Sequence, residues 1–238
     1  MSGKAVDTPK TVRVGEKDLP VWNEEQRVEV VDEHLYATVF DDWPDYHDPL
    51  IARVHELEEI KWGNDKPDSR TLGGKKVHHL EQWDCPAADL INERAKEFFR
   101  RLLNEDTANI DQSWANLYYK WDYAVPHSHR LSVASLVYFL EIGDPDPDDE
   151  LSGRLSFADP RMKICCSDEE GYVTTRPYIG SNNGKMLIWP SKFVHFVTPY
   201  AGDNPRITLA WNISRYKGEL LPDDKPIVNV APTPTSRV

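Results

Sequence analysis

Residues 131–142 read LSVASLVYFLEI, a run of β-branched, aromatic and aliphatic side chains that ends at a glycine. Short runs of this kind, bounded by Gly, Pro, Asp or Asn, are typical of buried β-strands. Similar runs fill the second half of the chain: SWANLYYKW (113–121), GRLSFAD (153–159), GYVTTRPYI (171–179), GKMLIWPS (184–191), FVHFVTPY (193–200) and RITLAWNIS (206–214). This spacing predicts an antiparallel sandwich or barrel after about residue 110.

The first half of the chain carries helical patterns instead. Apolar residues three and four apart predict an amphipathic helix over residues 48–60, with Asp48 as its N-cap. Residues 85–106 predict a second helix, because acidic residues lead and arginines trail, which suits the helix dipole. Residues 27–40 indicate one or two strands, and residues 68–83 a loop punctuated by glycines. The expected fold is α+β, with N-terminal helices packed on one sheet of a jelly roll.

The length of 238 residues suits one compact domain. We expect this domain to span residues 27–216, with a helical N-terminal part at 27–110 and a β core at 111–216. Residues 1–26 are expected to form a flexible N-terminal segment, and residues 217–238 a proline-rich tail.

Charge and cysteine content narrow the classes of partner. A net charge of −12 repels nucleic acid and anionic lipid, so we expect neither as a partner. Three cysteines, two of them adjacent, do not indicate a disulfide framework and favour the reducing cytoplasm. The N-terminus has no apolar core of a signal peptide, and no apolar run suits a membrane helix. A homodimer is the default expectation for an oligomer.

Two histidines lie two residues apart in VPHSHR (125–130). Residues i and i+2 of a strand face the same side, so His127 and His129 would point together toward one cation. His195 lies in the apolar segment SKFVHFVTPY, and the intervening strands of a jelly roll would return it to the same place. These three residues are candidate metal ligands; the alternative is a pair of surface histidines and one histidine of the core.

Arg206 opens the run RITLAWNIS and shares a strand face with Thr208. An arginine inside a barrel is costly unless an anion pairs with it, and a carboxylate is its natural partner. Thr208 would add a hydroxyl hydrogen bond. Arg206 is therefore a candidate carboxylate-binding residue; the alternative is a structural salt bridge to one of the 40 acidic residues.

The order of PHSHRLSVASLVYFLE, GRLSFADPR and GKMLIWPSKFVHFVTPYAGDNPRITLAWNIS resembles the iron(II)- and 2-oxoglutarate-dependent oxygenases of bacteria and phages. The similarity covers roughly residues 33–216. It implies a double-stranded β-helix, the cupin-like form of the jelly roll. It also implies Fe(II) at the three histidines, and 2-oxoglutarate with its far carboxylate held by Arg206 and Thr208. Asn116 and either Tyr118 or Tyr119 are further candidates to contact 2-oxoglutarate.

Two departures from the family pattern bear on the site. Leu136 follows Ser135 where the family has glycine. His129 stands where the wider superfamily has the carboxylate of a two-histidine, one-carboxylate triad, so the site has one more positive charge. A substitute carboxylate, such as that of Asp122, is the second alternative for this ligand.

The resemblance implies a dioxygenase that hydroxylates a C–H bond of a small molecule or of a peptide side chain, with molecular oxygen as co-substrate. Two other interpretations remain open. One is a three-histidine cupin-type metalloenzyme that does not use 2-oxoglutarate, which the histidine set favours. The other is a non-catalytic β-sandwich binding module with histidines in its core. Arg206 and Thr208 favour the oxygenase.

Overall fold

The computed structural model describes residues 10–62, 74–129, 131–145, 148–149, 151–158 and 182–217. Its major sheet has the strand order β3-β4-β10-β8-β12-β6-β5. These strands are β3 (Glu29–Asp32), β4 (Leu35–Val39), β5 (Lys75–His78), β6 (Asn109–Tyr118), β8 (Ala134–Glu141), β10 (Lys185–Pro190) and β12 (Arg206–Ser214). The minor sheet has the order β7-β11-β9, with β7 (Ala124–His127), β9 (Leu155–Phe157) and β11 (His195–Val197).

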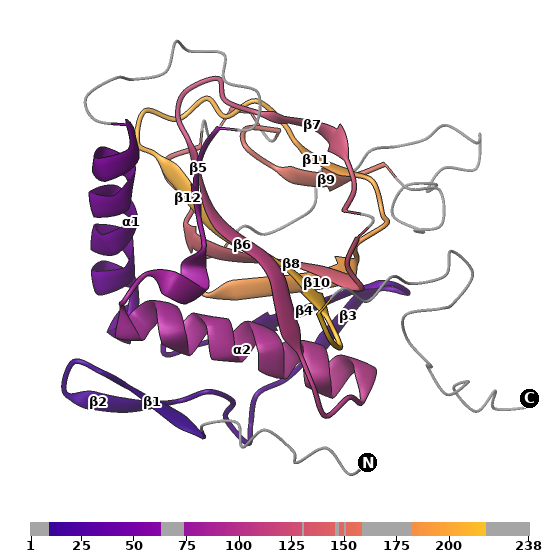
Figure 1. Ribbon diagram of the computed structural model, residues 1–238. Helices are drawn as coiled ribbons and strands as arrows, with labels where there is room; N and C mark the ends of the chain where they lie inside the picture. Colours follow the sequence, from indigo (N-terminus) through magenta and orange to yellow (C-terminus); the bar gives the residue numbers. More distant parts are fainter. Residues whose placement is uncertain are drawn as a thin grey trace, which may run out of the picture.

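The two sheets face each other, and neighbouring strands within each sheet run antiparallel. Figure 1 shows the minor sheet above β8 and β10, with the two helices on the outer side of the major sheet. This arrangement confirms the expected α+β fold, a double-stranded β-helix with N-terminal helices packed on one sheet.

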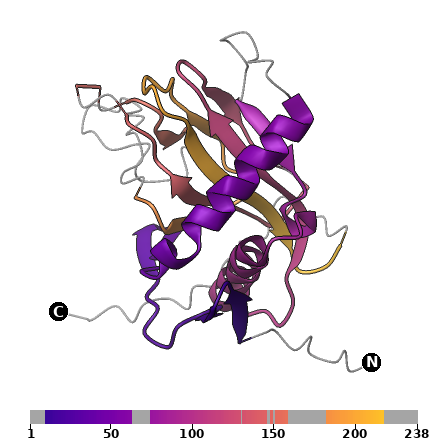
Figure 2. The ribbon, with the colours of Figure 1, turned by 90° about the vertical axis from the view of Figure 1, so that its left-hand side faces the viewer.

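The helices agree with the sequence patterns. Helix α1 (His47–Trp62) covers the expected range 48–60, and α2 (Pro86–Leu103) lies within 85–106. Proline at the first position of α2 loses no hydrogen bond, and Asn104 ends the helix in the left-handed conformation. Figure 2 shows α1 running across the outer face of the sheet. Two short 3-10 helices, η1 (Trp43–Asp45) and η2 (Leu80–Gln82), precede α1 and α2.

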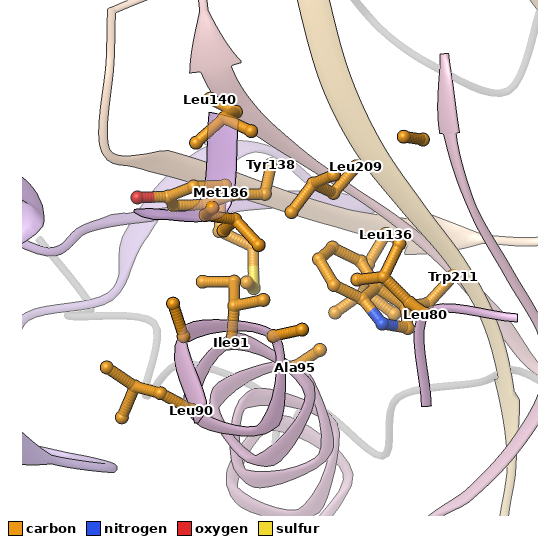
Figure 3. Packing of buried hydrophobic residues seen from close by; sticks show 14 of the residues in the cluster. Leu80, Leu90, Ile91, Ala95, Leu136, Tyr138, Leu140, Met186, Leu209 and Trp211 are labelled. Atoms are coloured by element: carbon orange, nitrogen blue, oxygen red, sulfur yellow. The ribbon is translucent and has the colours of Figure 1, made fainter. Parts of the chain in front are cut away.

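The larger hydrophobic core lies between the helices and the major sheet. Figure 3 shows Ile91 and Ala95 of α2 pointing at side chains of the sheet, among them Trp211 and Leu136. Trp211 also donates its indole N–H to Asn92 Oδ1 at 2.8 Å. Leu136 is fully buried here, where burial of a leucine contributes about 1.5–3 kcal/mol. The leucine that replaces the family's glycine thus stabilises the contact with the helices.

A second hydrophobic cluster lies between the two sheets. It includes Tyr118 and Phe139 of the major sheet and Phe157 of the minor sheet. Phe157 of this cluster also lies beside His195, at 6.3 Å between ring centroids, so the cluster reaches the histidines.

Two segments differ from the sequence expectation. Part of the expected flexible segment forms a hairpin of β1 (Thr11–Val14) and β2 (Lys17–Pro20), and its residues Val14 and Leu19 are buried in the larger core. Part of the expected loop at 68–83 is strand β5, on the edge of the major sheet. The sequence missed both because four-residue strands show little periodicity.

The expected strand at 171–179 and the proline-rich tail, apart from residue 217, lie outside the described residues. Among the described helices, none is both long and apolar enough to span a membrane.

Candidate metal centre

His127, His129 and His195 come together at one end of the β-helix interior. His127 ends β7 and pairs in register with His195, the first residue of β11. Ring centroids are 5.1 Å apart for His127 and His129, 4.4 Å for His127 and His195, and 5.2 Å for His129 and His195. One ring nitrogen from each lies within 4.8 Å of the other two. Within the described ranges this is the one such group of three potential metal ligands.

Backbone hydrogen bonds orient two of these rings. His127 Nδ1 lies 2.7 Å from the carbonyl oxygen of Val125, and His195 Nδ1 lies 3.1 Å from that of Phe193. Because a carbonyl only accepts, both Nδ1 atoms carry the proton and Nε2 is left with its lone pair free. Metal-binding histidines are commonly oriented in this way.

The three imidazoles are held in the neutral form that binds metals. Burial, followed by the nearby His127, lowers the pKa of His195 to about 3. Burial and the charge of His127 lower the pKa of His129 to about 4. The pKa of His127 is lowered as well, first by burial. Neutral histidines do not have to release a proton when a metal binds.

Asp122 does not join this cluster. Its carboxylate accepts the backbone N–H of Tyr119 at 2.9 Å. The ring nearest to His129 on the major sheet is Trp114, at 5.6 Å between centroids, and Trp189 lies 5.0 Å from His195. The cluster is therefore three imidazoles between aromatic walls, and no carboxylate joins it among the residues that the structure describes.

Arg206 lies in the same cavity as the histidines, on β12 of the facing sheet. It is 3% exposed, and its Nη1 is buried without a hydrogen-bond partner among the described residues. Its guanidinium lies 5.4 Å from the ring centroid of Tyr118 and 5.6 Å from that of Phe139. Burial lowers the pKa of Arg206 to about 10. In the described part of the chain Arg206 has no acidic partner, so the alternative of a structural salt bridge is not supported there.

Asn116, Tyr118 and Thr208 line this cavity beside Arg206. Thr208 pairs in register with Asn116, and Arg206 with Tyr118. The amide of Asn116 donates to Thr208 Oγ1 at 3.4 Å. Burial raises the pKa of Tyr118 to about 12, so its hydroxyl stays protonated and can donate.

Tyr119 lies on the opposite face of the strand and does not line this cavity, which corrects its candidacy as a cosubstrate contact. Its hydroxyl donates to the carboxylate of Glu58 on α1, at 2.7 and 2.9 Å. Successive residues of a strand point to opposite faces, so only one of the two tyrosines can face the interior. The helices cover the other face, and Tyr119 belongs to that contact.

Lys76 and Trp114 are among the cavity residues that were not sequence candidates. Lys76 lies on β5, in the segment expected to be a loop, and Trp114 lies on β6. The ammonium group of Lys76 lies 5.3 Å from the ring centroid of Trp114. The signal that could have found Lys76 is the alternation of KKVH, in which Lys76 and His78 share a face.

Comparison with known proteins gives a match in the β core. Residues 112–212, somewhat less than half of the chain, match the sequence model of a family described as "Putative 2OG-Fe(II) oxygenase". The matched region contains the three histidines, Arg206 and Thr208. No match was found among curated proteins.

Solved structures share the fold at low sequence identity. AviO1 from Streptomyces viridochromogenes is 18% identical with a TM-score of 0.56, covering 80% of this chain and 94% of its own. HygX from Streptomyces hygroscopicus, with nickel and 2-oxoglutarate bound, is 10% identical with a TM-score of 0.55, covering 77% and 83%. A viral collagen prolyl hydroxylase from Paramecium Bursaria Chlorella virus-1, in a 2-oxoglutarate complex, is 13% identical with a TM-score of 0.51, covering 78% and 97%.

The residues of this chain fit the two groups that such oxygenases use. Three converging neutral imidazoles suit Fe(II), and a buried guanidinium with a free donor suits the far carboxylate of 2-oxoglutarate. In the sequence of its β core and in its fold, the chain resembles the 2-oxoglutarate- and Fe(II)-dependent oxygenases.

Proposed function

We propose that this protein is an iron(II)- and 2-oxoglutarate-dependent dioxygenase that hydroxylates a C–H bond of a small molecule or a peptide side chain. The observation that carries the proposal is the pairing of two features in one cavity. A cluster of three histidines lies on the minor sheet, and a buried arginine without an acidic partner among the described residues lies on the facing strand β12.

His127, His129 and His195 are the proposed iron ligands. Three protein ligands on one side of an iron ion leave positions for a cosubstrate and oxygen, as in other non-haem oxygenases. The carboxylate of the usual triad is replaced by His129, whose ring lies about equally far from the other two. With three neutral ligands, the charge of a bound Fe(II) would not be offset by a carboxylate, and its attraction for an anionic cosubstrate would be stronger.

Arg206, Thr208, Tyr118 and Asn116 are the proposed residues for 2-oxoglutarate. Arg206 has an unpaired Nη1 to donate to the far carboxylate, and Thr208, two residues on, presents its hydroxyl on the same strand face. The protonated hydroxyl of Tyr118 is a further donor. The contacts of the Arg206 guanidinium with the rings of Tyr118 and Phe139, at 5.4 and 5.6 Å from their centroids, restrict its direction before a ligand arrives.

The aromatic side chains around the histidines also exclude water from the site. Trp114, Trp189 and Phe157 surround the histidines, and such apolar side chains exclude water from the reacting centre. When bound, iron and 2-oxoglutarate supply the oxidising chemistry, in which oxygen is consumed and 2-oxoglutarate becomes succinate and carbon dioxide. The chain itself positions the groups and keeps the ligand imidazoles neutral.

The structural neighbours support the reaction class. One of them holds nickel and 2-oxoglutarate, and another is a collagen prolyl hydroxylase in complex with 2-oxoglutarate. The net charge of −12 supports a small-molecule or peptide substrate over nucleic acid. The buried free thiol of Cys85 supports a reducing compartment such as the cytoplasm.

A three-histidine metalloenzyme that does not use 2-oxoglutarate is the second candidate, and the presence of His129 in place of a carboxylate favours it. The unpaired donor of Arg206 favours the oxygenase, because that alternative gives the buried cation no partner.

The proposal is tested by succinate release from the purified protein supplied with Fe(II), 2-oxoglutarate and oxygen but no other substrate. We expect slow succinate formation that requires all three and disappears in His195→Ala. If the protein binds iron yet forms no succinate above the protein-free background, the three-histidine alternative replaces the oxygenase.

A further inference from the structure

Strand β5 carries two adjacent lysines that face opposite sides of the major sheet. Lys75 points to α1, where its ammonium group lies 2.7 Å from Glu58 Oε1. Lys76 points into the cavity that holds the three histidines and Arg206. One lysine is thus used to join helix and sheet, and the other is presented to whatever occupies the cavity.

Lys76 is half-buried and has no carboxylate within ion-pair distance among the described residues. Its ammonium group lies over the ring of Trp114, and Trp114 in turn contacts His129. Burial lowers the pKa of Lys76. A lysine that could point into solvent is held instead against an aromatic wall next to the proposed iron ligands.

Lys76 and Arg206 lie on different strands, β5 and β12, with β6 between them. Lys76 pairs with Asn116 of β6, which pairs with Thr208 of β12. Adjacent strands lie about 4.8 Å apart, so the Cα atoms of Lys76 and Thr208 are about 10 Å apart. Arg206 lies two residues beyond Thr208 along β12. The two cations therefore stand at different places on the cavity wall.

The cavity is positive inside an acidic protein. Its described lining contains Lys76, Arg206 and the three histidines, and no aspartate or glutamate. With three neutral imidazole ligands, Fe(II) and the 2-oxoglutarate dianion would together be neutral, so Lys76 and Arg206 leave an excess of two positive charges in the cavity. With the usual carboxylate ligand in place of His129, the excess would be one. Arg206 is proposed to contact 2-oxoglutarate, whereas Lys76 has no negatively charged group beside it in the described cavity.

We infer that the substrate of the proposed oxygenase carries an anionic oxygen group, a carboxylate or a tetrahedral sulfate or phosphate ester, that binds the ammonium group of Lys76. This inference rests on the proposed function and names the substrate class for it. Hydroxylation would then take place at a carbon a short distance from the anion.

The test is anion binding to the protein loaded with Fe(II) and 2-oxoglutarate, measured anaerobically by calorimetry at low ionic strength. Acetate and sulfate are the probes, one for a carboxylate and one for a tetrahedral anion. We expect one of them to bind wild type, and Lys76→Gln to weaken that binding about tenfold or more. Lys76→Arg keeps the charge and should retain most of the affinity. Lys120→Gln, which removes one charge from an exposed pair with Asp203, should bind as wild type does.

Two results overturn the inference: neither anion binds wild type, or Lys76→Gln binds the anion as tightly as wild type. A third does so too, namely a loss of 2-oxoglutarate affinity in Lys76→Gln, because Lys76 would then be a cosubstrate ligand. A protein that binds no 2-oxoglutarate contradicts the proposed function instead. The heat of 2-oxoglutarate binding, recorded first on the same sample, separates the two failures.

Discussion

His127 and His195 are register partners on the neighbouring strands β7 and β11, and their ring centroids lie 4.4 Å apart. Two proposed iron ligands are therefore fixed by the hydrogen-bonded ladder of one small sheet. His129, two residues after His127, completes the set of proposed ligands. Its backbone N–H donates to the carbonyl oxygen of Ser191 at 2.7 Å. A site built on paired strands keeps its geometry without the metal.

Substitution of one of these histidines should remove the metal and keep the fold. In His195→Ala we expect iron affinity to fall at least about a hundredfold, more than the loss of an outer-shell partner causes. The measurement is iron content per chain after anaerobic dialysis. His79→Ala, which loses an exposed histidine outside the cluster, should retain about one iron per chain. Full iron retention in His195→Ala would remove this residue from the ligand set.

Arg206→Met should separate stability from cosubstrate binding. The side chain is buried without an acidic partner among the described residues, so its replacement should leave the melting temperature of the ligand-free protein unchanged or raise it. A ligand at a hundred times its dissociation constant stabilises a protein by about 2.7 kcal/mol. We expect 2-oxoglutarate with iron to give wild type this stabilisation and to give Arg206→Met none.

The matched control for that experiment is Arg13→Met, which removes an exposed arginine of the β1–β2 hairpin. It should keep the full response to 2-oxoglutarate. If Arg206→Met unfolds the ligand-free protein, Arg206 has a structural partner and its cosubstrate role loses its main support.

Two adjacent tyrosines should behave oppositely when each is changed to phenylalanine. Tyr118→Phe removes a donor from the cavity, so 2-oxoglutarate affinity should fall about three- to tenfold with little change in stability. Tyr119→Phe removes the hydroxyl from the buried carboxylate of Glu58, which should cost about 1–3 kcal/mol of unfolding free energy and leave 2-oxoglutarate affinity unchanged. Calorimetry measures the 2-oxoglutarate affinity of both variants, and urea unfolding measures their stability. If Tyr119→Phe weakened 2-oxoglutarate binding and Tyr118→Phe did not, Tyr119 would be the cosubstrate contact.

His47 should make the protein less stable in mild acid. It is buried at the start of α1, with Nε2 2.6 Å from the hydroxyl of Tyr138, and burial lowers its pKa to about 4. The unfolded chain takes up this proton near pH 6.5, whereas the folded chain does so near pH 4. The contribution is therefore fully present above pH 6.5 and is lost as the pH falls toward 4.

Urea unfolding of the metal-free protein at pH 7 and pH 5 measures this effect. Between these two values the contribution of His47 should fall by about 1–2 kcal/mol. His47→Gln should lose that part of the pH dependence, whereas the surface variant His79→Gln should keep it. An unchanged difference between the two pH values in His47→Gln would show that this histidine does not titrate on unfolding.

The sequence predicted those parts of the site in which two residues lie two positions apart on one strand and therefore face the same side. The spacing of His127 and His129 places both on one side of an extended segment, and the same rule places Arg206 beside Thr208. The two long helices were predicted because apolar residues recur three and four positions apart, most clearly in α2. The order of the motifs along the chain then indicated the double-stranded β-helix.

Other features depend on contacts between distant segments and could not be predicted in this way. Tyr118 and Tyr119 are chemically alike, and only the position of α1 decides which of them faces the cavity. Lys76 lies on a four-residue edge strand that resembles a loop in sequence. The β1–β2 hairpin was missed because its burial depends on α2, on which it packs.

In the proposed site, the three histidines bind an iron ion to which 2-oxoglutarate, held by Arg206, is also bound. The most direct measurement is the visible absorbance of the anaerobic protein on addition of Fe(II) and then 2-oxoglutarate, in wild type, His129→Ala and Arg206→Met. We predict a weak metal-to-ligand charge-transfer band in wild type that His129→Ala removes. In Arg206→Met the band should need much more 2-oxoglutarate. Iron binding without any such band in wild type would contradict 2-oxoglutarate binding at this iron site.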